Sequence, residues 1–249
     1  MRYRAKKIQI KTSSMQVSII IPVFNEAALI RPFLLNLRER TGGAEIIVVD
    51  GGSSDGTEEL AQSFCDGIIR SGERSRAKQM NVGAAAASGD VFWFLHADAE
   101  VPLESLNEIA RIMHDPKVCG GFFRIRLPTV PPVYRLTDGF AHYAGLLLRM
   151  RCGDHGIFCR QTAFVDAGGF PDVPLMEDVE FFRRLRCCGR IVHSNKRIEA
   201  SPRRYEAVGP TRLTFAYGLI ATLYVFGVPL SRLAQIYQRA CCAAETTTP

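Results

Sequence analysis

Two short apolar runs, each ended by turn-forming residues, restrict the fold of this chain more than any other feature. Val17 to Pro22 (VSIIIP) and Glu45 to Val49 (EIIVV) are rich in β-branched residues, as buried parallel strands are. The second run passes directly into Asp50-Gly51-Gly52-Ser53-Ser54-Asp55-Gly56-Thr57, which presents Asp50 at the tip of the expected strand. Ligands bind at that rim in open α/β sheets, so the sequence predicts a site there.

Helices and strands alternate through the first half of the chain. Apolar residues at helical spacing predict a helix over 27–40, and a glycine pair ends it. The elements expected next are helices over 57–64 and 75–87 and strands over 67–70 and 91–95. This order predicts an α/β fold with a mainly parallel, twisted sheet flanked by helices. The residues that follow expected strands, and that one cleft can therefore collect, are Asn25, Glu26, Asp50 and Asp98.

The pattern is less regular in the second half. The elements expected there are a helix over 103–113, a strand over 118–127, a proline-rich break over 128–132, a helix over 134–150, a loop entering a short strand over 153–158, a turn over 168–171 and a helix over 176–187. The length of 249 residues is enough for one large domain with an extension. We expect a basic extension over 1–15, the α/β domain over 16–210, and an apolar helical extension with a loose tail over 211–249.

The charge and the cysteine content of the chain argue for some classes of ligand and against others. Lys and Arg exceed Asp and Glu by 31 to 25, a formal net charge of +6, and basic residues cluster near the N-terminus, at 183–190 and at 203–204. Such clusters suit phosphates or anionic headgroups, whereas nucleic-acid binding is not expected because no recognition pattern accompanies them. Eight cysteines without a C-x-x-C motif argue against structural zinc and favour a reduced, cytoplasmic location. No cleavable secretory signal is expected.

The segment around Asp50 is the first candidate for chemistry. Its carboxylate can accept hydrogen bonds from a ribose or a base edge. Arg76, Lys78 and Gln79 begin an expected helix, from which cations and an amide can reach a phosphate or a base. The glycine-rich segment by itself equally suits a plain strand-to-helix turn capped by Asp55. The carboxylate at the strand tip and the polar residues of the expected helix together favour a nucleotide as the ligand.

Two further acidic segments are candidates. His96-Ala97-Asp98 ends a strand and can hold Mg²⁺ or Mn²⁺, which prefer few protein oxygens plus the phosphates of a substrate; the alternative is that Asp98 merely caps a helix. Glu177-Asp178 begins a helix, where acids are stabilised by the dipole in any case. One of these two carboxylates can also lie in a cleft and act as a general base.

These segments together resemble glycosyltransferase family 2, which has the GT-A fold. The motifs that carry the resemblance are Pro22-x-x-Asn25-Glu26, Val48-Val49-Asp50 with the glycine-rich turn, Arg76-x-x-Gln79-x-Asn81-x-Gly83, His96-x-Asp98, Gly168-Gly169-Phe170 and Glu177-Asp178. They occur in the order and spacing of the family over residues 17 to about 205. The segments FLHAD, GDHGIF and MEDVEF look most like a small bacterial subgroup that is often tied to arsenosugar biosynthesis.

The resemblance implies a donor site for a nucleotide-diphosphate sugar. The positions that it implies for nucleotide-sugar binding are Pro22, Asn25, Glu26, Asp50, Gly52, Ser53, Arg76, Lys78, Gln79, Ala97 and Asp98. Glu26 and Asp50 would contact base and ribose, and Asp98 would hold a divalent cation, Mn²⁺ or Mg²⁺, on the diphosphate. Asp178, beside Glu177, would take the proton from the acceptor hydroxyl. One base and no covalent nucleophile imply inversion at the anomeric carbon.

Two departures from the family pattern bear on mechanism. His96 stands where the family's metal motif usually has an acid, so either His96 ligates the metal with Asp98, or Glu100 shares the task. The Gln-x-x-Arg-Trp segment of processive members is replaced by Pro202-Arg203-Arg204-Tyr205, so a long-chain polysaccharide synthase is not expected. The residues expected on the acceptor or diphosphate side are Asp154, His155, Arg203 and Arg204, although a structural loop and solvated arginines fit as well.

An uncharged apolar segment, Leu213 to Leu230, lies between Arg212 and Arg232. Eighteen helical residues rise about 27 Å, just short of a hydrocarbon core of about 30 Å. The segment suits an interfacial helix on the inner face of the membrane or a homodimer contact, a helix packed on the domain, or a spanning helix.

The function expected from all of this is an inverting glycosyltransferase with a small-molecule or lipid-linked acceptor. The alternatives are a polyprenyl-phosphate glycosyl synthase and a sugar-nucleotide-binding module without turnover. A nicotinamide dehydrogenase is not expected, because no G-x-G-x-x-G follows the first strand.

Overall fold

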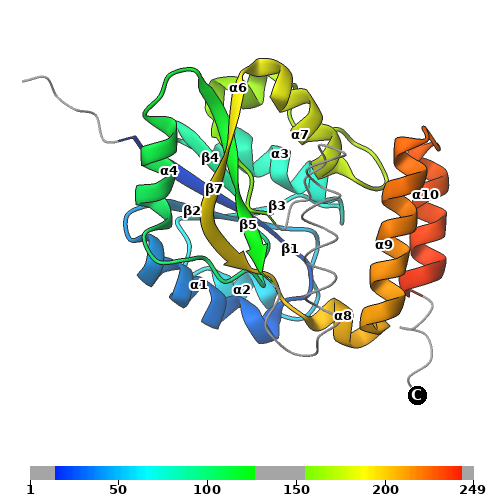
Figure 1. Cartoon of the computed structure of the whole chain (residues 1–249). Coiled ribbons are helices and arrows are strands. Elements are labelled where there is room, and N and C mark those ends of the chain that lie inside the picture. Colours follow the sequence, from blue (N-terminus) through cyan, green and yellow to red (C-terminus); the bar gives the residue numbers. More distant parts are fainter. Residues whose placement is uncertain (1–14, 127–154, 243–249) are drawn as a thin grey trace, which may run out of the picture.

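The computed structural model describes residues 15–126 and 155–242, and its centre is one seven-stranded sheet (Figure 1). The strand order is β3-β2-β1-β4-β6-β5-β7. The strands are β1 (Val17–Val23), β2 (Glu45–Asp50), β3 (Gly67–Arg70), β4 (Val91–Phe94), β5 (Val118–Arg126), β6 (Phe158–Arg160) and β7 (Arg190–Glu199). β6 runs antiparallel to both of its neighbours, and all other pairs are parallel. The expected α/β fold with a mainly parallel sheet is confirmed.

Helices cover both faces of the sheet. They are α1 (Ala27–Thr41), α2 (Thr57–Ala61), α3 (Arg76–Ala86), α4 (Ser105–Met113), α6 (Gln161–Asp166), α7 (Glu177–Cys188), α8 (Arg203–Val208), α9 (Pro210–Val225) and α10 (Leu230–Tyr237), which a short π-helical turn (Gln238–Cys242) follows. The core has two layers because side chains alternate along each strand. Ile19 and Ile21 of β1 pack with α1 and α4, whereas Ile20 packs with α3, α6 and α7.

Helix α3 lies unusually close to the sheet at Gly83. A Cβ atom there would lie 2.5 Å from Cγ2 of Ile20 and 2.9 Å from Cγ2 of Val49. Both neighbours are branched side chains of buried strands, which have few rotamers to escape into. The glycine therefore sets how near α3 comes to β1 and β2, and with it the position of the first turn of α3 at the edge of the sheet.

Strand β7 and the helices α6 and α8 were not predicted from the sequence. β7 is the outermost strand of the sheet, and only Ser194 and Ile198 are buried along it. The half-buried Lys196 and the exposed Arg197 interrupt the apolar run that identifies a central strand, and charged residues of this kind are common on edge strands. The expected strand at 118–127 is observed as β5, with residue 127 outside the described residues, as is the expected helix over 134–150.

The apolar segment Leu213 to Leu230 is not one helix, and the prediction of eighteen continuous helical residues is wrong. α9 ends at Val225, Gly227 adopts a left-handed φ of +78°, and α10 begins at Leu230. The chain therefore folds back, and α10 packs beside α9 (Figure 1). The two helices share a small cluster of their own with α8, around Leu213 and Ala216. Among the described residues, no helix combines the length and the apolar character needed to cross a membrane.

Candidate active site

The site lies at the edge where β1, β2 and β4 end. β1 pairs in parallel with β2 on one side and β4 on the other, so the loops that follow Val23, Asp50 and Phe94 leave from the same edge. These loops carry Asn25 and Glu26, the glycine-rich segment, and His96 to Asp98. The predicted gathering of these segments is what the topology produces.

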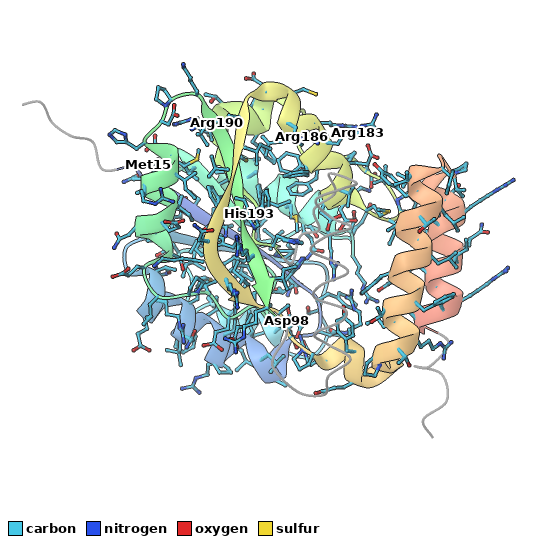
Figure 2. All side chains as sticks on the ribbon, in the orientation of Figure 1. Met15, Asp98, Arg183, Arg186, Arg190 and His193 are labelled. Carbon is cyan, nitrogen blue, oxygen red and sulfur yellow. The ribbon has the colours of Figure 1, made fainter. Side chains whose placement is uncertain are left out.

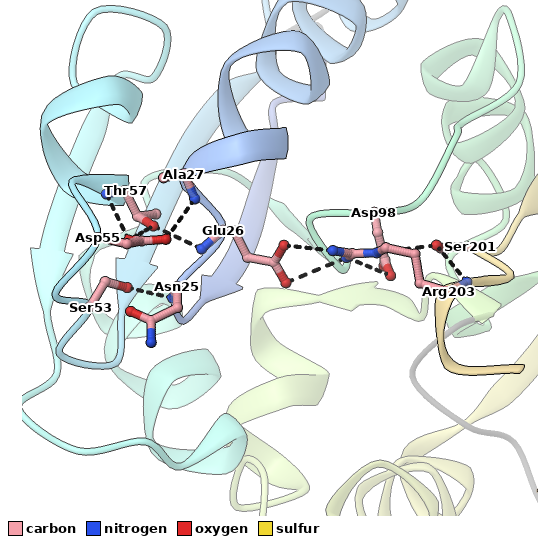
Figure 3. Close-up of polar contacts among 9 residues, drawn as sticks. All are labelled: Asn25, Glu26, Ala27, Ser53, Asp55, Thr57, Asp98, Ser201 and Arg203. Atoms are coloured by element: carbon pink, nitrogen blue, oxygen red, sulfur yellow. Dashed lines mark hydrogen bonds and ion pairs between the residues drawn. The ribbon is translucent and has the colours of Figure 1, made fainter. Parts of the chain in front are cut away.

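The loops after β1 and β2 are tied together by backbone donors of one loop and side chains of the other. The pairs, with their donor–acceptor distances, are Asn25 N to Ser53 Oγ (2.8 Å), Ser54 N to Asn25 Oδ1 (3.0 Å), Glu26 N to Thr57 Oγ1 (2.8 Å) and Ala27 N to Asp55 Oδ2 (3.0 Å). Figure 3 shows three of these four contacts. Thr57 donates its hydroxyl to Asp55, and this hydrogen bond lowers the pKa of the Asp55 carboxyl. The pairs make a single two-loop platform, with Asn25 in a left-handed conformation at φ 53°.

Asp50 is buried, and its carboxylate serves its own loop. One oxygen accepts from the backbone N–H groups of Gly52 (2.9 Å) and Ser53 (2.8 Å), and the other accepts from the Ser53 hydroxyl. A carboxylate offers about four lone-pair sites, so three of them are occupied. The residue expected to bind base or ribose is in this structure the residue that shapes the turn.

Gln79 is likewise placed inside the protein. It is 2% exposed, and its Nε2 donates to the carbonyl oxygens of Val23 and Val49, both at 2.8 Å. Val23 is the last residue of β1 and Val49 is the last but one of β2, so both carbonyls lie where the strands pass into their loops. Gln79 was expected near the nucleotide; its amide instead joins the two strand ends beneath the site.

The other residues at the start of α3 face outward. Ser75 caps the helix by accepting from Lys78 N (3.4 Å). Arg76 is exposed, and its guanidinium has no hydrogen bond or ion pair with the described part of the chain. The ammonium of Lys78 pairs with Glu73 and lies 3.7 Å from Asp172. The pKa of Lys78 is raised, and the hydrogen bond to Glu73 is the largest cause.

The segment before α7 is held against α3. The side-chain amide of Asn81 donates to Phe170 O (2.8 Å) and accepts from Phe170 N (2.9 Å), so the glycine turn at 168–171 is fixed to this helix. β7 runs in the same direction as β4, because two antiparallel pairings separate β4 from β5 and β5 is parallel to β7. α7 leads into β7 through Gly189 alone, so α7 runs against the strands and begins toward their carboxyl ends. Glu177 and Asp178 form that first turn.

Asp178 is half-buried in this turn. One of its oxygens accepts from Val179 N at 2.7 Å, and Met176 before the helix adopts a left-handed φ of 62°. The buried face of α7, with Phe181, Phe182 and Leu185, packs into the core and fixes the orientation of the helix. That Asp178 and Asp98 face one hollow stays a prediction; the topology puts both at the same edge of the sheet.

The most informative contact of the site is made by Arg203. Its guanidinium lies between two acids, with Nη1 at 3.1 Å from Glu26 Oε2 and Nη2 at 3.1 Å from Asp98 Oδ2 (Figure 3). A longer bond of 3.5 Å joins Nη2 to Glu26 Oε1. Partial burial lowers the pKa of Arg203, but the two carboxylates raise it by more, so the net shift is upward. Segments 177 and 105 residues apart in sequence meet at this point.

Arg204 points elsewhere, since neighbouring residues of a helix do not share a face. Its Nη1 lies 3.2 Å from the hydroxyl of Tyr217 on α9. His155 packs edge-on against Phe122, with ring centroids 5.9 Å apart, and Asp154 lies outside the described residues. Of the four residues expected on the acceptor or diphosphate side, only Arg203 has a described contact with the acids of the site. Sequence reasoning missed Ser201, whose hydroxyl accepts from Arg203 Nε at 3.3 Å; a lone serine before a helix gives no signal of such a role.

The described residues fit a divalent cation through Asp98 alone. Asp98 is exposed, His96 is half-buried and Ala97 between them is buried. Glu100 pairs with Arg40 at 2.6 Å, so its carboxylate is engaged away from Asp98. No group of three or more metal-binding side chains occurs in residues 15–126 and 155–242. Mg²⁺ and Mn²⁺ use one or two carboxylates together with substrate phosphates, so we expect one exposed Asp to hold such an ion weakly by itself and more tightly when a diphosphate is bound.

The architecture is the GT-A fold, which the structural neighbours of this chain share. A family model described as glycosyl transferase family 2 matches residues 18–166, and the chain belongs to this family. Glycosyltransferase AglE of Haloferax volcanii is 28% identical over 170 residues, which cover 63% of this chain and 56% of AglE. The chain spans 56% and 61% of the lengths of the first two curated relatives.

Two solved structures illustrate the shared fold. Mannosyltransferase PcManGT from Pyrobaculum calidifontis, in complex with GDP-Man and Mn²⁺, superposes with a TM-score of 0.68 at 20% identity, over 94% of this chain and 74% of its own. S. aureus TarS 1–349, in complex with UDP-GlcNAc, superposes with a TM-score of 0.61 at 18% identity, over 80% and 65% of the two chains.

Proposed function

We propose that this glycosyltransferase moves a sugar, with inversion, from a nucleotide-diphosphate sugar to an acceptor hydroxyl. The observation that carries the proposal is the contact of Arg203 with Glu26 and Asp98 where β1 and β4 end. Open α/β sheets bind nucleotides at this place; the two carboxylates can accept from sugar hydroxyls, and the guanidinium can pair with a phosphate. The donors named for the structural neighbours, GDP-Man and UDP-GlcNAc, support the donor class but not the base.

The predicted donor residues divide into two kinds in this proposal. Glu26 and Arg76 contact the donor; Arg76 is exposed, and the Glu26 carboxylate is paired with Arg203 in the structure. Asp50 and Gln79 act by position: Asp50 holds the turn of Gly52 and Ser53, and Gln79 fixes the strand ends below it. The platform around Asn25 then holds the two loops at a constant spacing.

Asp98 would hold a divalent cation, with His96 as the neighbouring nitrogen ligand of the prediction. Such an ion neutralises the negative charge that gathers on the departing diphosphate. In the structure the Oδ2 atom of Asp98 accepts from Arg203. The Mn²⁺ named for PcManGT supports the choice of metal.

Asp178 would act as the general base. Its carboxylate stands in the first turn of α7, where the helix dipole favours the charged form, and the turn lies toward the carboxyl edge of the sheet. A base that removes the proton of the acceptor hydroxyl lets that oxygen attack the anomeric carbon directly. One displacement without a covalent intermediate gives inversion.

The proposal is tested by donor binding and by one substitution. A panel of UDP-, GDP- and dTDP-sugars with and without Mn²⁺ should include a member that stabilises the protein, by about 2.7 kcal/mol at one hundred times its dissociation constant. Asp178→Asn should retain that stabilisation while sugar transfer falls about 10²- to 10⁴-fold, because only the proton transfer is lost. Asp166→Asn, which changes an exposed acid at the end of α6, should alter neither.

The outcomes separate the alternatives. Unchanged transfer by Asp178→Asn would remove the residue from the mechanism. Donor binding with no transfer to any acceptor would favour a sugar-nucleotide-binding module. A product that partitions into an organic phase would favour a polyprenyl-phosphate glycosyl synthase over a small-molecule acceptor. The subgroup tied to arsenosugar biosynthesis stays a prediction from the sequence segments.

We propose that residues 16–210 form the catalytic domain and that the extension at 211–249 makes a peripheral contact with an anionic, cytoplasmic membrane face. Solvent-exposed residues of α9 form one stripe at i, i+3 and i+4 spacing: Arg212, Phe215, Leu219, Thr222 and Phe226. Phe215 is 75% and Phe226 80% exposed. The sequence from 210 to 242 contains three arginines and no acid, which complements anionic headgroups. Self-association through the same stripe is the competing outcome.

A further inference from the structure

We propose that Arg203 is the internal counter-cation of the donor site and becomes its diphosphate contact. In the structure its guanidinium lies between Glu26 and Asp98. When donor and divalent cation bind, Asp98 would pass to the metal and the guanidinium to the phosphates. The inference rests on the proposed function and adds a residue-level exchange to it.

The first argument is how Arg203 is anchored. It is the first residue of α8, a helix of six residues of which none is buried. Its side chain is 46% exposed, and its described contacts are all polar: Glu26, Asp98 and the hydroxyl of Ser201. α8 contributes no buried residue, so a stronger anion can attract the guanidinium without disturbing the core.

The second argument is charge. Two carboxylates and one guanidinium leave this group of side chains with a formal charge of −1 at neutral pH. A divalent cation adds twice the positive charge of Arg203 at the same carboxylates, and two like-signed ions about 4 Å apart repel by several kcal/mol at an effective dielectric constant of about 20. Arg203 and a metal at Asp98 therefore compete for one partner unless a further anion is present.

The third argument is the shape of the incoming group. A guanidinium presents a rigid fork of N–H donors that matches a phosphate in a bidentate way, and such charge-assisted bonds are about twice as strong as neutral ones. A diphosphate beside Asp98 supplies the anion that the released Arg203 needs. The same residue thus lowers the affinity for bare metal and raises the affinity for metal together with a diphosphate.

Arg203 is expected to weaken the binding of metal alone and to strengthen the binding of a diphosphate with metal, and a test can measure both affinities. Arg203→Ala should bind Mn²⁺ alone several-fold more tightly than the wild type, as measured by electron paramagnetic resonance of free Mn²⁺. The same variant should bind UDP or GDP, at a fixed saturating Mn²⁺ concentration, about 10- to 100-fold more weakly by calorimetry, the loss expected for one charge-assisted contact. Arg203→Lys should bind Mn²⁺ as the wild type does, because it retains the charge, and should recover only part of the nucleotide affinity.

Arg190→Ala is the matched control. It also releases a carboxylate from an arginine, since Arg190 Nη2 lies 2.6 Å from Asp115 Oδ2. Arg190 begins β7 at the opposite edge of the sheet, and Figure 2 shows it far from Asp98. Neither Mn²⁺ nor nucleotide affinity should change in this variant.

The results separate this inference from the proposed function. If the wild type binds no nucleoside diphosphate under any condition, the donor site itself is refuted. If the wild type binds one and Arg203→Ala loses only thermal stability, with both affinities unchanged, Arg203 is a structural tie for α8 and the inference is overturned. Changes of both affinities in the same direction overturn it as well.

Discussion

Gln79 shows how one side chain can determine the geometry of a site that it does not enter. Its amide nitrogen donates to Val23 O and Val49 O from inside the protein. At the end of β1, Val23 O also accepts from Gly51 N at 2.9 Å, so the amide of Gln79 adds a second donor there. A single amide that serves both ends fixes the spacing from which the loops of Asn25 and Asp50 depart.

Replacement of Gln79 by Leu should therefore destabilise the fold. The substitution keeps the volume approximately and removes both hydrogen bonds of the amide, each of which contributes about 1 kcal/mol. We expect the free energy of unfolding in urea to fall by about 2 kcal/mol. Gln62→Leu, at an exposed position after α2, should change it by less than about 0.5 kcal/mol. Equal effects of the two substitutions would mean that the amide is dispensable.

At this scale the sequence predicted which residues gather but not which way they face. The strand ends and the glycine-rich turn were enough to bring Asn25, Glu26 and Asp98 to one edge. Asp50 and Gln79 were expected to face the ligand, and both face inward. A polar side chain at a strand tip can satisfy either a ligand or the loop itself, and only tertiary contacts decide between the two.

Glu108 connects two elements, α4 and the outer strand β7. It is 8% exposed, and its carboxylate accepts from Arg111 Nε (2.8 Å), Arg111 Nη2 (2.9 Å) and the hydroxyl of the buried Ser194 (2.7 Å). The hydrogen bond from Arg111 is the main cause that lowers the pKa of Glu108, and the bond from Ser194 adds to it against the opposing effect of burial. This contact helps to hold β7 against the remainder of the sheet.

A lowered pKa in the folded state makes the stability depend on pH in a defined direction. The contribution of Glu108 is complete above the pKa of a glutamate in the unfolded chain, about 4.3, and is lost as the pH falls through the lower folded value. Glu108→Gln should therefore be less stable than the wild type at pH 7, and the difference should shrink as urea unfolding is repeated at decreasing pH below about 5. Glu104→Gln, at an exposed residue of the same region, should leave the profile of the wild type. A constant difference down to pH 3 would contradict the assignment.

Strands were predicted correctly where their apolar residues form an uninterrupted run. The inner strands β1, β2 and β4 are continuous apolar runs, and their bounds were predicted to within one residue. β7 escaped prediction because it is half-exposed and carries Lys196 and Arg197 among its apolar residues. In the apolar stretch after Arg212, hydropathy alone does not distinguish one helix from two, and the left-handed Gly227 decides for two.

On the described surface of the molecule, exposed apolar residues gather in the stripe along α9 and its C-cap, with Phe215, Leu219 and Phe226. Exposed aromatic residues in a segment without acids favour an anionic bilayer surface. The full chain should float with vesicles that contain phosphatidylglycerol and less with phosphatidylcholine alone. The double variant Phe215→Ser and Phe226→Ser should lose most of this binding.

Two controls show whether the exposed stripe of α9 binds a membrane or a second copy of the chain. Val165→Ser removes an apolar side chain that is 69% exposed on α6, outside the stripe, and should float as the wild type does. Size-exclusion chromatography without lipid reports on self-association. A dimer that Phe215→Ser and Phe226→Ser dissociates, together with no flotation of the wild type, would assign the stripe to a second copy of the chain.

The reversed direction of β6 has a consequence for how such an enzyme can diversify. β5 ends at Arg126 on the edge where the acids gather, and β6, which runs the other way, begins at Phe158 on that same edge. The chain thus departs from and re-enters the sheet at the edge that carries the candidate site. Residues can be substituted, inserted or deleted between these two anchor points without changing the order in which the strands pair.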